Sequence, residues 1–175
     1  IAIEPGPRFT PLAWAIYKND GHLTQMLIER GANLLARVTK DQISLVELAG
    51  QTAGPDVWRV ILNALSWDHE EVQRGWFRAV AFNSSMVVHW FLCAGYDPRP
   101  LNQWGWSALQ LAMKHDAWDV AKLLARLELF DPHAPDPEGS SAYLRAKRIR
   151  GKEGLLDIGW QTTLVAINGS QGGKN

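Results

Sequence analysis

The chain has 175 residues, 46% of them hydrophobic, which is enough material for one domain of ordinary size. It carries 18 basic and 18 acidic residues, so the overall charge gives no reason to expect a nucleic acid or a membrane surface as a partner. The single cysteine, Cys93, excludes an internal disulfide framework and favours a reducing compartment, cytoplasmic or nuclear. No segment approaches the ~18 consecutive apolar residues of a membrane helix. Because the chain begins at Ile1 without a methionine, we expect a monomeric module of a larger intracellular protein.

The first predicted pair of helices lies in the stretch "TPLAWAIYKNDGHLTQMLIERGAN", residues 10–33. Thr10 can cap a helix, and apolar residues at helical spacing follow it. Asn19 tolerates the left-handed conformation and therefore predicts the turn between the two helices. Gly31 predicts the C-terminal stop of the second helix.

The same pattern recurs along the chain. Further copies begin at Ser44, Arg74, Ser107 and, incompletely, Ser141, so that successive starts are 34, 30, 33 and 34 residues apart. In this register one small residue coincides in all five copies: Ala15, Ala49, Ala79, Ala112 and Ala146. Small residues at that position let neighbouring helices approach closely.

The repeat resembles the ankyrin repeat, a unit of about 33 residues with the signature T-P-L-H-x-A. Thr10-Pro11-Leu12 and Ala15 match that signature, whereas Ala13 replaces its histidine and the other copies are degenerate. The resemblance covers roughly residues 8–157. It implies an all-α solenoid of stacked antiparallel helix pairs joined by short β-hairpins or loops, with an irregular helical bundle as the alternative.

We expect residues 1–7 to be a lead-in segment, residues 8–157 the repeat domain, and residues 158–175 a C-terminal cap followed by a Gly/Ser-rich tail. One junction departs from the pattern. The 30-residue spacing around "SWDHEEVQ" predicts a shortened or absent hairpin before the third copy, and a lengthened helix from about Asp68 to Phe82.

Motifs for catalysis are missing from the sequence. The five histidines show neither a zinc spacing nor H-E-x-x-H, and no glycine-rich phosphate loop follows a predicted strand. Cys93 lies in the apolar stretch "WFLCAG", which indicates a small packed side chain rather than a nucleophile. We therefore expect a protein that is not an enzyme and that holds no cofactor and no metal.

Nine tryptophans are several times the usual share and suggest a binding surface. We expect Trp58 and Trp76 in the core and Trp14 packed between neighbouring repeats. The resemblance implies that a partner protein or peptide contacts the hairpin tips and the concave face of the first helices. By register this predicted partner surface contains Phe9, Tyr17, Lys18, Ile43, Gln51, Phe82, Trp104, Trp106, Lys114 and His115, with Arg148 adding charge complementarity. We expect Trp104 and Trp106 to be exposed anchors.

Three alternatives remain open for this surface. Trp104 and Trp106 can form walls of an aromatic cage, because ankyrin modules of certain histone-lysine methyltransferases read methylated lysine in this way. The chain can also be the substrate-recruiting domain of a multidomain enzyme. Finally, the tail or another domain can cover the groove. The basic run "RAKRIRGK" is typical of the polar face of a terminal repeat, or of a patch for nuclear localisation or an anionic partner.

Overall fold

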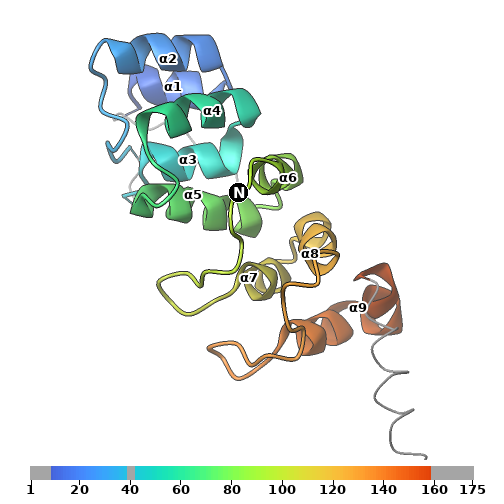
Figure 1. Ribbon diagram of the computed structural model, residues 1–175. Helices are drawn as coiled ribbons and strands as arrows, with labels where there is room; N and C mark the ends of the chain where they lie inside the picture. The colour runs from blue at the N-terminus through green and yellow to red at the C-terminus, as the bar shows by residue number, and fades with distance from the viewer. Residues whose placement is uncertain (1–8, 39–41, 159–175) are drawn as a thin grey trace, which may run out of the picture. The chain divides into compact units, whose positions relative to one another are not determined.

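The computed structural model describes residues 9–38 and 42–158 (Figure 1). Within these ranges the backbone forms nine helices and two isolated β-bridges. The chain divides into two compact units, Ile1–Pro98 and Arg99–Asn175. The expected lead-in segment and the expected Gly/Ser-rich tail lie outside the described residues.

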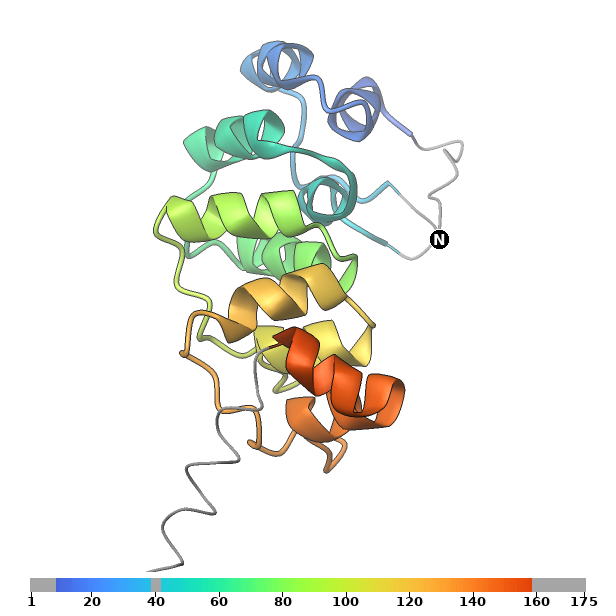
Figure 2. The same ribbon diagram turned by 90° about the vertical axis from the view of Figure 1, so that its right-hand side faces the viewer.

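The N-terminal unit consists of three helix pairs. Its helices are α1 (Pro11–Tyr17), α2 (Gly21–Glu29), α3 (Leu45–Thr52), α4 (Pro55–Ala64), α5 (Glu70–Ala81) and α6 (Ser85–Cys93). The first helices of the pairs, α1, α3 and α5, pack on one another in chain order, and the second helices, α2, α4 and α6, do the same (Figure 2). The prediction of helix pairs stacked in sequence order is therefore confirmed for this unit.

The C-terminal unit is built from α7 (Ala108–Lys114), α8 (Trp118–Ala125) and α9 (Ala142–Ile158). Helix α7 packs against both α8 and α9. Helix α9 bends at Gly151, where the backbone adopts a φ of 58°. The fifth copy thus begins with its first helix, as the sequence predicts.

Local chemistry explains where the first helices begin. Thr10, Ser44 and Ser107 are N-caps whose hydroxyl oxygens accept a hydrogen bond from a backbone N–H in the first helical turn. Ser44 and Ser107 also form capping boxes, in which Glu47 and Gln110 bond back to the backbone of the cap. The repeated Thr or Ser therefore marks a physical helix start.

The turns inside the pairs follow the predicted chemistry at three of four places. Asn19, Asn83 and Asp116 adopt φ values of 55°, 56° and 55°, in the left-handed region that Asn and Asp tolerate. The equivalent Ala53 has a φ of −90°. At that place the first repeat supplies the stabilising contact, because Asn19 Oδ1 accepts a 2.6 Å hydrogen bond from the backbone N–H of Gly54.

The junction before α5 lacks the β-bridge that is found before α3 and before α9. Antiparallel bridges join Arg37 to Ser44 and Pro135 to Ser141, whereas no bridge precedes α5 among the described residues. Helix α5 is lengthened instead, so the predicted helix over 68–82 is confirmed within two residues of each end. The buried Glu71 carboxylate in its first turn accepts hydrogen bonds from Ser44 Oγ and, at 3.2 Å, from Arg37 Nη2. Helix α5 is thereby joined directly to the preceding repeat.

Close backbone contact fixes the packing of α3 on α5. A Cβ atom on Gly50 would lie 2.1 Å from the carbonyl oxygen of Gly75. A Cβ atom on Gly75 would lie 2.4 Å from Cη2 of Trp58, whose side chain is fully buried. No side chain fits at either position, so the two helices approach as closely as their backbones allow.

We predict that Gly75→Ala destabilises the protein. Replacing a helical glycine by alanine ordinarily raises stability by up to about 1 kcal/mol, because alanine has the higher helix propensity. Here the added methyl group meets the Trp58 ring and the carbonyl oxygen of Val46, and we expect a loss of about 1–3 kcal/mol from overpacking. Chemical denaturation measures the change. Gln73→Ala, on the same helix and only partly buried, should stay within ~0.5 kcal/mol of wild type. A stabilising Gly75→Ala would contradict the close approach.

Candidate partner-binding surface

The predicted surface of the N-terminal unit starts with an aromatic group formed by Phe9, Trp14 and Tyr17. The three rings meet edge to face, with centroids 5.2 Å apart for Phe9–Trp14 and 6.0 Å for Phe9–Tyr17. Trp14 keeps 41% of its surface exposed. Its ring contacts Phe9 and Tyr17 of its own repeat, and the expected packing of Trp14 between neighbouring repeats stays a prediction.

Cations accompany the exposed rings of this unit. The ammonium of the exposed Lys18 lies 5.8 Å from the Trp14 ring centroid and 5.6 Å from that of Tyr17. Phe82, 38% exposed at the end of α5, has the guanidinium of Arg78 5.0 Å from its ring. Both arrangements are cation–π contacts that hold a ring and a charge at the surface together.

Two predicted contact residues of this unit are less accessible. Ile43 is 7% exposed, because the backbone pairing of Val38 with Ile43 turns the loop so that the Ile43 side chain joins the core. The prediction that Ile43 faces a partner is wrong. Gln51, near the end of α3, is partly exposed.

In the C-terminal unit, a tight turn presents Trp104. The Asn102 side-chain oxygen accepts hydrogen bonds from the backbone N–H groups of Trp104 (3.0 Å) and Trp106 (2.9 Å). The backbone closes the turn as well, since Asn102 N donates to Trp106 O at 2.9 Å. Gly105 completes it with a φ of 81°, which glycine adopts without strain. Trp104 at the tip is 69% exposed, as the sequence predicts.

Trp106 differs from its neighbour, because its side chain is only 5% exposed. Lys114 Nζ lies 4.2 Å from the ring centroid, and the guanidinium carbon of Arg145 lies 5.3 Å from it. The prediction that Trp106 is an exposed anchor is therefore wrong. In an extended segment, residues two positions apart point to the same side. Here the turn at Gly105 lies between Trp104 and Trp106, so one side chain is exposed and the other is buried.

A charged network surrounds Trp106. Arg145 donates to Asp136 Oδ2 at 2.7 Å and to Glu138 Oε2 at 2.8 Å, and Lys114 is paired with Glu138. Burial alone would raise the pKa of Asp136, but hydrogen bonds from Arg145 and from the backbone of Ser140 and Glu138 lower it below the ordinary value. This network fixes the loop that covers Trp106.

The remaining predicted residues of this unit lie at its surface. Lys114 and His115 end α7, and both are exposed, although the ammonium of Lys114 is engaged with Glu138 and Trp106. Arg148 is exposed on α9. Of the predicted set, Trp104, Lys114, His115 and Arg148 are the exposed residues of this unit.

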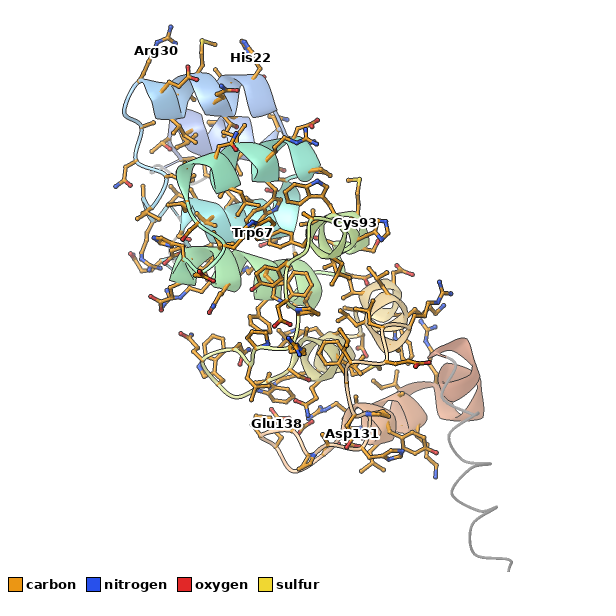
Figure 3. All side chains as sticks on the ribbon, in the orientation of Figure 1. His22, Arg30, Trp67, Cys93, Asp131 and Glu138 are labelled. Carbon is orange, nitrogen blue, oxygen red and sulfur yellow. The ribbon has the colours of Figure 1, made fainter. Side chains whose placement is uncertain are left out.

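The structure also shows surface residues that the repeat register does not point to. Trp67 lies in the loop before α5 (Figure 3). It packs on Trp90 of α6 and on Tyr96, and all three residues are partly exposed. Cys93 is exposed and its sulfur lies 3.5 Å from His89 Nε2, so the expectation of a packed cysteine is wrong. The 30-residue spacing at this junction is the feature of the sequence that could have drawn attention to Trp67, because the residue lies in the shortened connection before α5.

Comparison with known proteins identifies the fold. No family model and no curated protein sequence matches the chain. Among solved structures, the chain is similar to the crystal structure of an ankyrin repeat domain from Acinetobacter baumannii AYE, with a TM-score of 0.62 and 22% sequence identity. The match covers 90% of this chain and 83% of that one. The chain has an ankyrin repeat fold, and none of its described helices is both long and apolar enough to cross a membrane.

We predict that alanine substitution lowers the stability of the protein much more at Trp106 than at Trp104. Trp106→Ala removes a buried ring that two cations contact and should cost ~3–5 kcal/mol of stability. Trp104→Ala removes a ring that contacts mainly solvent and should stay within ~0.5 kcal/mol of wild type. Thermal or urea melts of the two variants, run side by side, measure the difference. Equal losses for both would contradict the placement of these rings.

A second prediction concerns acid. The lowered pKa of Asp136 means that its ionised form stabilises the folded state above the ordinary carboxyl pKa, and that this stabilisation is lost as the pH falls through the lower, folded-state pKa. Removing the charge with Asp136→Asn leaves Arg145 without its buried partner and should cost ~3 kcal/mol at pH 7. Urea melts from pH 7 down to about 3 should show a smaller gap between variant and wild type at the acid end. A gap that is independent of pH would contradict the role of Asp136.

Proposed function

We propose that the chain is a non-catalytic protein-binding module in which Trp104 is the principal anchor for a partner. The observation that carries this proposal is the 69% exposure of Trp104 on a turn held by Asn102. A tryptophan this exposed on a fixed turn presents a large aromatic surface and an indole N–H that a partner can bury and hydrogen-bond. Tryptophan is also the residue most enriched among the hot spots of protein interfaces.

The geometry of the turn favours affinity as well as contact. Four hydrogen bonds within residues 102–106 and the left-handed Gly105 fix the backbone at the tip before any partner arrives. Ordering a loop upon binding costs free energy, and a loop that is already ordered avoids that cost. Trp104 is thus presented as a preorganised side chain.

The N-terminal unit adds a second group of accessible rings. Trp14 and Phe82 are 41% and 38% exposed, and Lys18 lies beside the first of them. Lys18 gives the N-terminal unit an exposed positive charge beside these rings, and Arg148 gives the C-terminal unit an exposed positive charge on α9. Such charges chiefly govern the rate and the specificity of association. A peptide or domain with aromatic-binding pockets and acidic residues fits this chemistry.

The geometry gives less support to a reader of methylated lysine at the hairpin. That function requires the Trp104 and Trp106 rings to stand open as two walls of one cage. Trp106 is 5% exposed, and Lys114 and Arg145 already lie beside its ring. We therefore favour a partner that contacts Trp104 alone.

The setting of the module is part of the same proposal. We place it in a larger cytoplasmic or nuclear protein, because the composition favours a reducing compartment. A parent that is a multidomain enzyme recruiting its substrate through this module is compatible with the fold, since ankyrin repeats serve unrelated functions on one scaffold. The sequence of the whole parent protein distinguishes these settings.

The proposal predicts a selective loss of partners in a pull-down. Immobilised wild type, Trp104→Ala and Leu144→Ala are exposed to the same cell extract, and bound proteins are quantified by mass spectrometry. Leu144 is the matched control, because it is a 53% exposed apolar residue of the same unit. Loss of a hot spot costs ~2 kcal/mol or more, so specific partners should fall about thirty-fold with Trp104→Ala and remain with Leu144→Ala. If Trp104→Ala retains every partner of the wild type, the anchor is wrongly assigned.

A further inference from the structure

Three partly exposed rings on the N-terminal unit form a surface that we call the aromatic platform: Trp67, Trp90 and Tyr96. The Trp67 centroid lies 6.3 Å from that of Trp90, with 30° between the ring planes. It lies 5.7 Å from that of Tyr96, with 40° between the planes. The rings come from the loop before α5, from α6 and from the segment after α6, and Figure 3 labels Trp67 at this place.

Buried rings support the platform from below. Phe91, which is 0% exposed, contacts all three platform rings at centroid distances of 5.3–5.6 Å. Trp76, 1% exposed, contacts Tyr96 at 5.0 Å. Because buried rings pack on one side of each platform ring, the platform is held in place before any ligand binds, and each of its residues keeps part of its surface open to water.

Two acidic residues are adjacent to the platform in the sequence. Asp68 follows Trp67 and is exposed, and Asp97 follows Tyr96. The pKa of Tyr96 is raised to about 12, first by burial and then by the negative charges of Asp97 and Asp68. Acidic side chains and the negative faces of aromatic rings both attract cations.

The platform also lacks the cation that comparable rings carry. Lysine or arginine lies over the rings of Trp14, Trp106 and Trp118. Among residues 9–38 and 42–158, no lysine or arginine lies over any platform ring, and none forms an ion pair with Asp68. A position suited to a positive charge is thus left open to a partner.

We propose that the aromatic platform and Asp68 bind an arginine side chain of a partner protein. The planar guanidinium stacks flat on aromatic faces and pairs with a carboxylate through two parallel hydrogen bonds, whereas the ammonium of lysine meets a ring or a carboxylate as a compact point charge. A cation between two rings needs them about 7–8 Å apart, since each contact takes about 3.5–4 Å. Trp67 and Trp90 are closer than that, so the guanidinium lies on the outside of the platform. This site is independent of Trp104 and of the binding proposed for it.

The test uses a defined probe and the whole chain. The ¹⁵N-labelled protein is titrated at constant ionic strength with the blocked tripeptide acetyl-Gly-Arg-Gly-amide, and the tryptophan indole signals are followed by NMR. Trp67→Phe and Trp90→Phe assign the two relevant signals. We expect saturable shifts at Trp67 and Trp90 with none at Trp104. Acetyl-Gly-citrulline-Gly-amide, which has the same shape without the charge, should bind at least about five-fold more weakly.

Two matched variants isolate the contribution of the carboxylate. Asp68→Asn removes the charge beside the platform and should weaken the arginine probe by about three- to five-fold, the range of an exposed ion pair. Asp56→Asn removes an equal charge on α4, where Asp56 is paired with Arg59, and should leave the affinity unchanged within two-fold. The proposal is overturned if both variants behave alike, if citrulline binds as well as arginine, or if acetyl-Gly-Lys-Gly-amide binds as tightly as the arginine probe.

Discussion

Backbone-to-backbone contact between first helices is the constraint on which the N-terminal unit depends. Gly50 and Gly75 bring α3 and α5 together until the carbonyl of one helix occupies the place where the other would need a side chain. The Trp58 ring fills the space above Gly75, and Ala49 and Ala79 are fully buried on the same helices. Such packing tolerates no added volume, and it sets the spacing at which each repeat follows the last.

Although the helices pack in this regular way, the segments that connect the helix pairs have different conformations. One connection is replaced by a lengthened α5, whose Glu71 reaches back to Ser44 and Arg37. In the C-terminal unit another is closed by the bonds of Asn102, and it turns Trp104 outward and Trp106 inward. The loops before α5 and α7 therefore place Trp67 and Trp104 at the surface, and the helices support both loops.

Local signals in the sequence predict much of the fold. The caps at Thr10, Ser44 and Ser107 and the left-handed turns at Asn19, Asn83 and Asp116 depend on residues within a few positions, so they can be read from a single chain. The surface is harder to predict, because burial of a loop residue depends on distant partners. Trp106 is covered by Lys114 and Arg145, and Arg145 is positioned by Asp136, none of which a repeat register places beside it. The exposure of Ile43 and Trp67 is equally hard to predict. A turn in the loop before α3 buries Ile43, and the shortened connection before α5 places Trp67 at the surface.

The central claim is that some tryptophans are buried and structural, whereas others are exposed and available to a partner. Trp58, Trp76 and Trp106 belong to the first group, and Trp104 belongs to the second. The most direct measurement is ¹⁹F NMR of the protein labelled with 5-fluorotryptophan, recorded with a soluble paramagnetic agent that broadens signals in proportion to their exposure. The account predicts strong broadening for Trp104, clear broadening for Trp14, and sharp signals for the three buried rings. A Trp106 signal that broadens as much as that of Trp104 would contradict it.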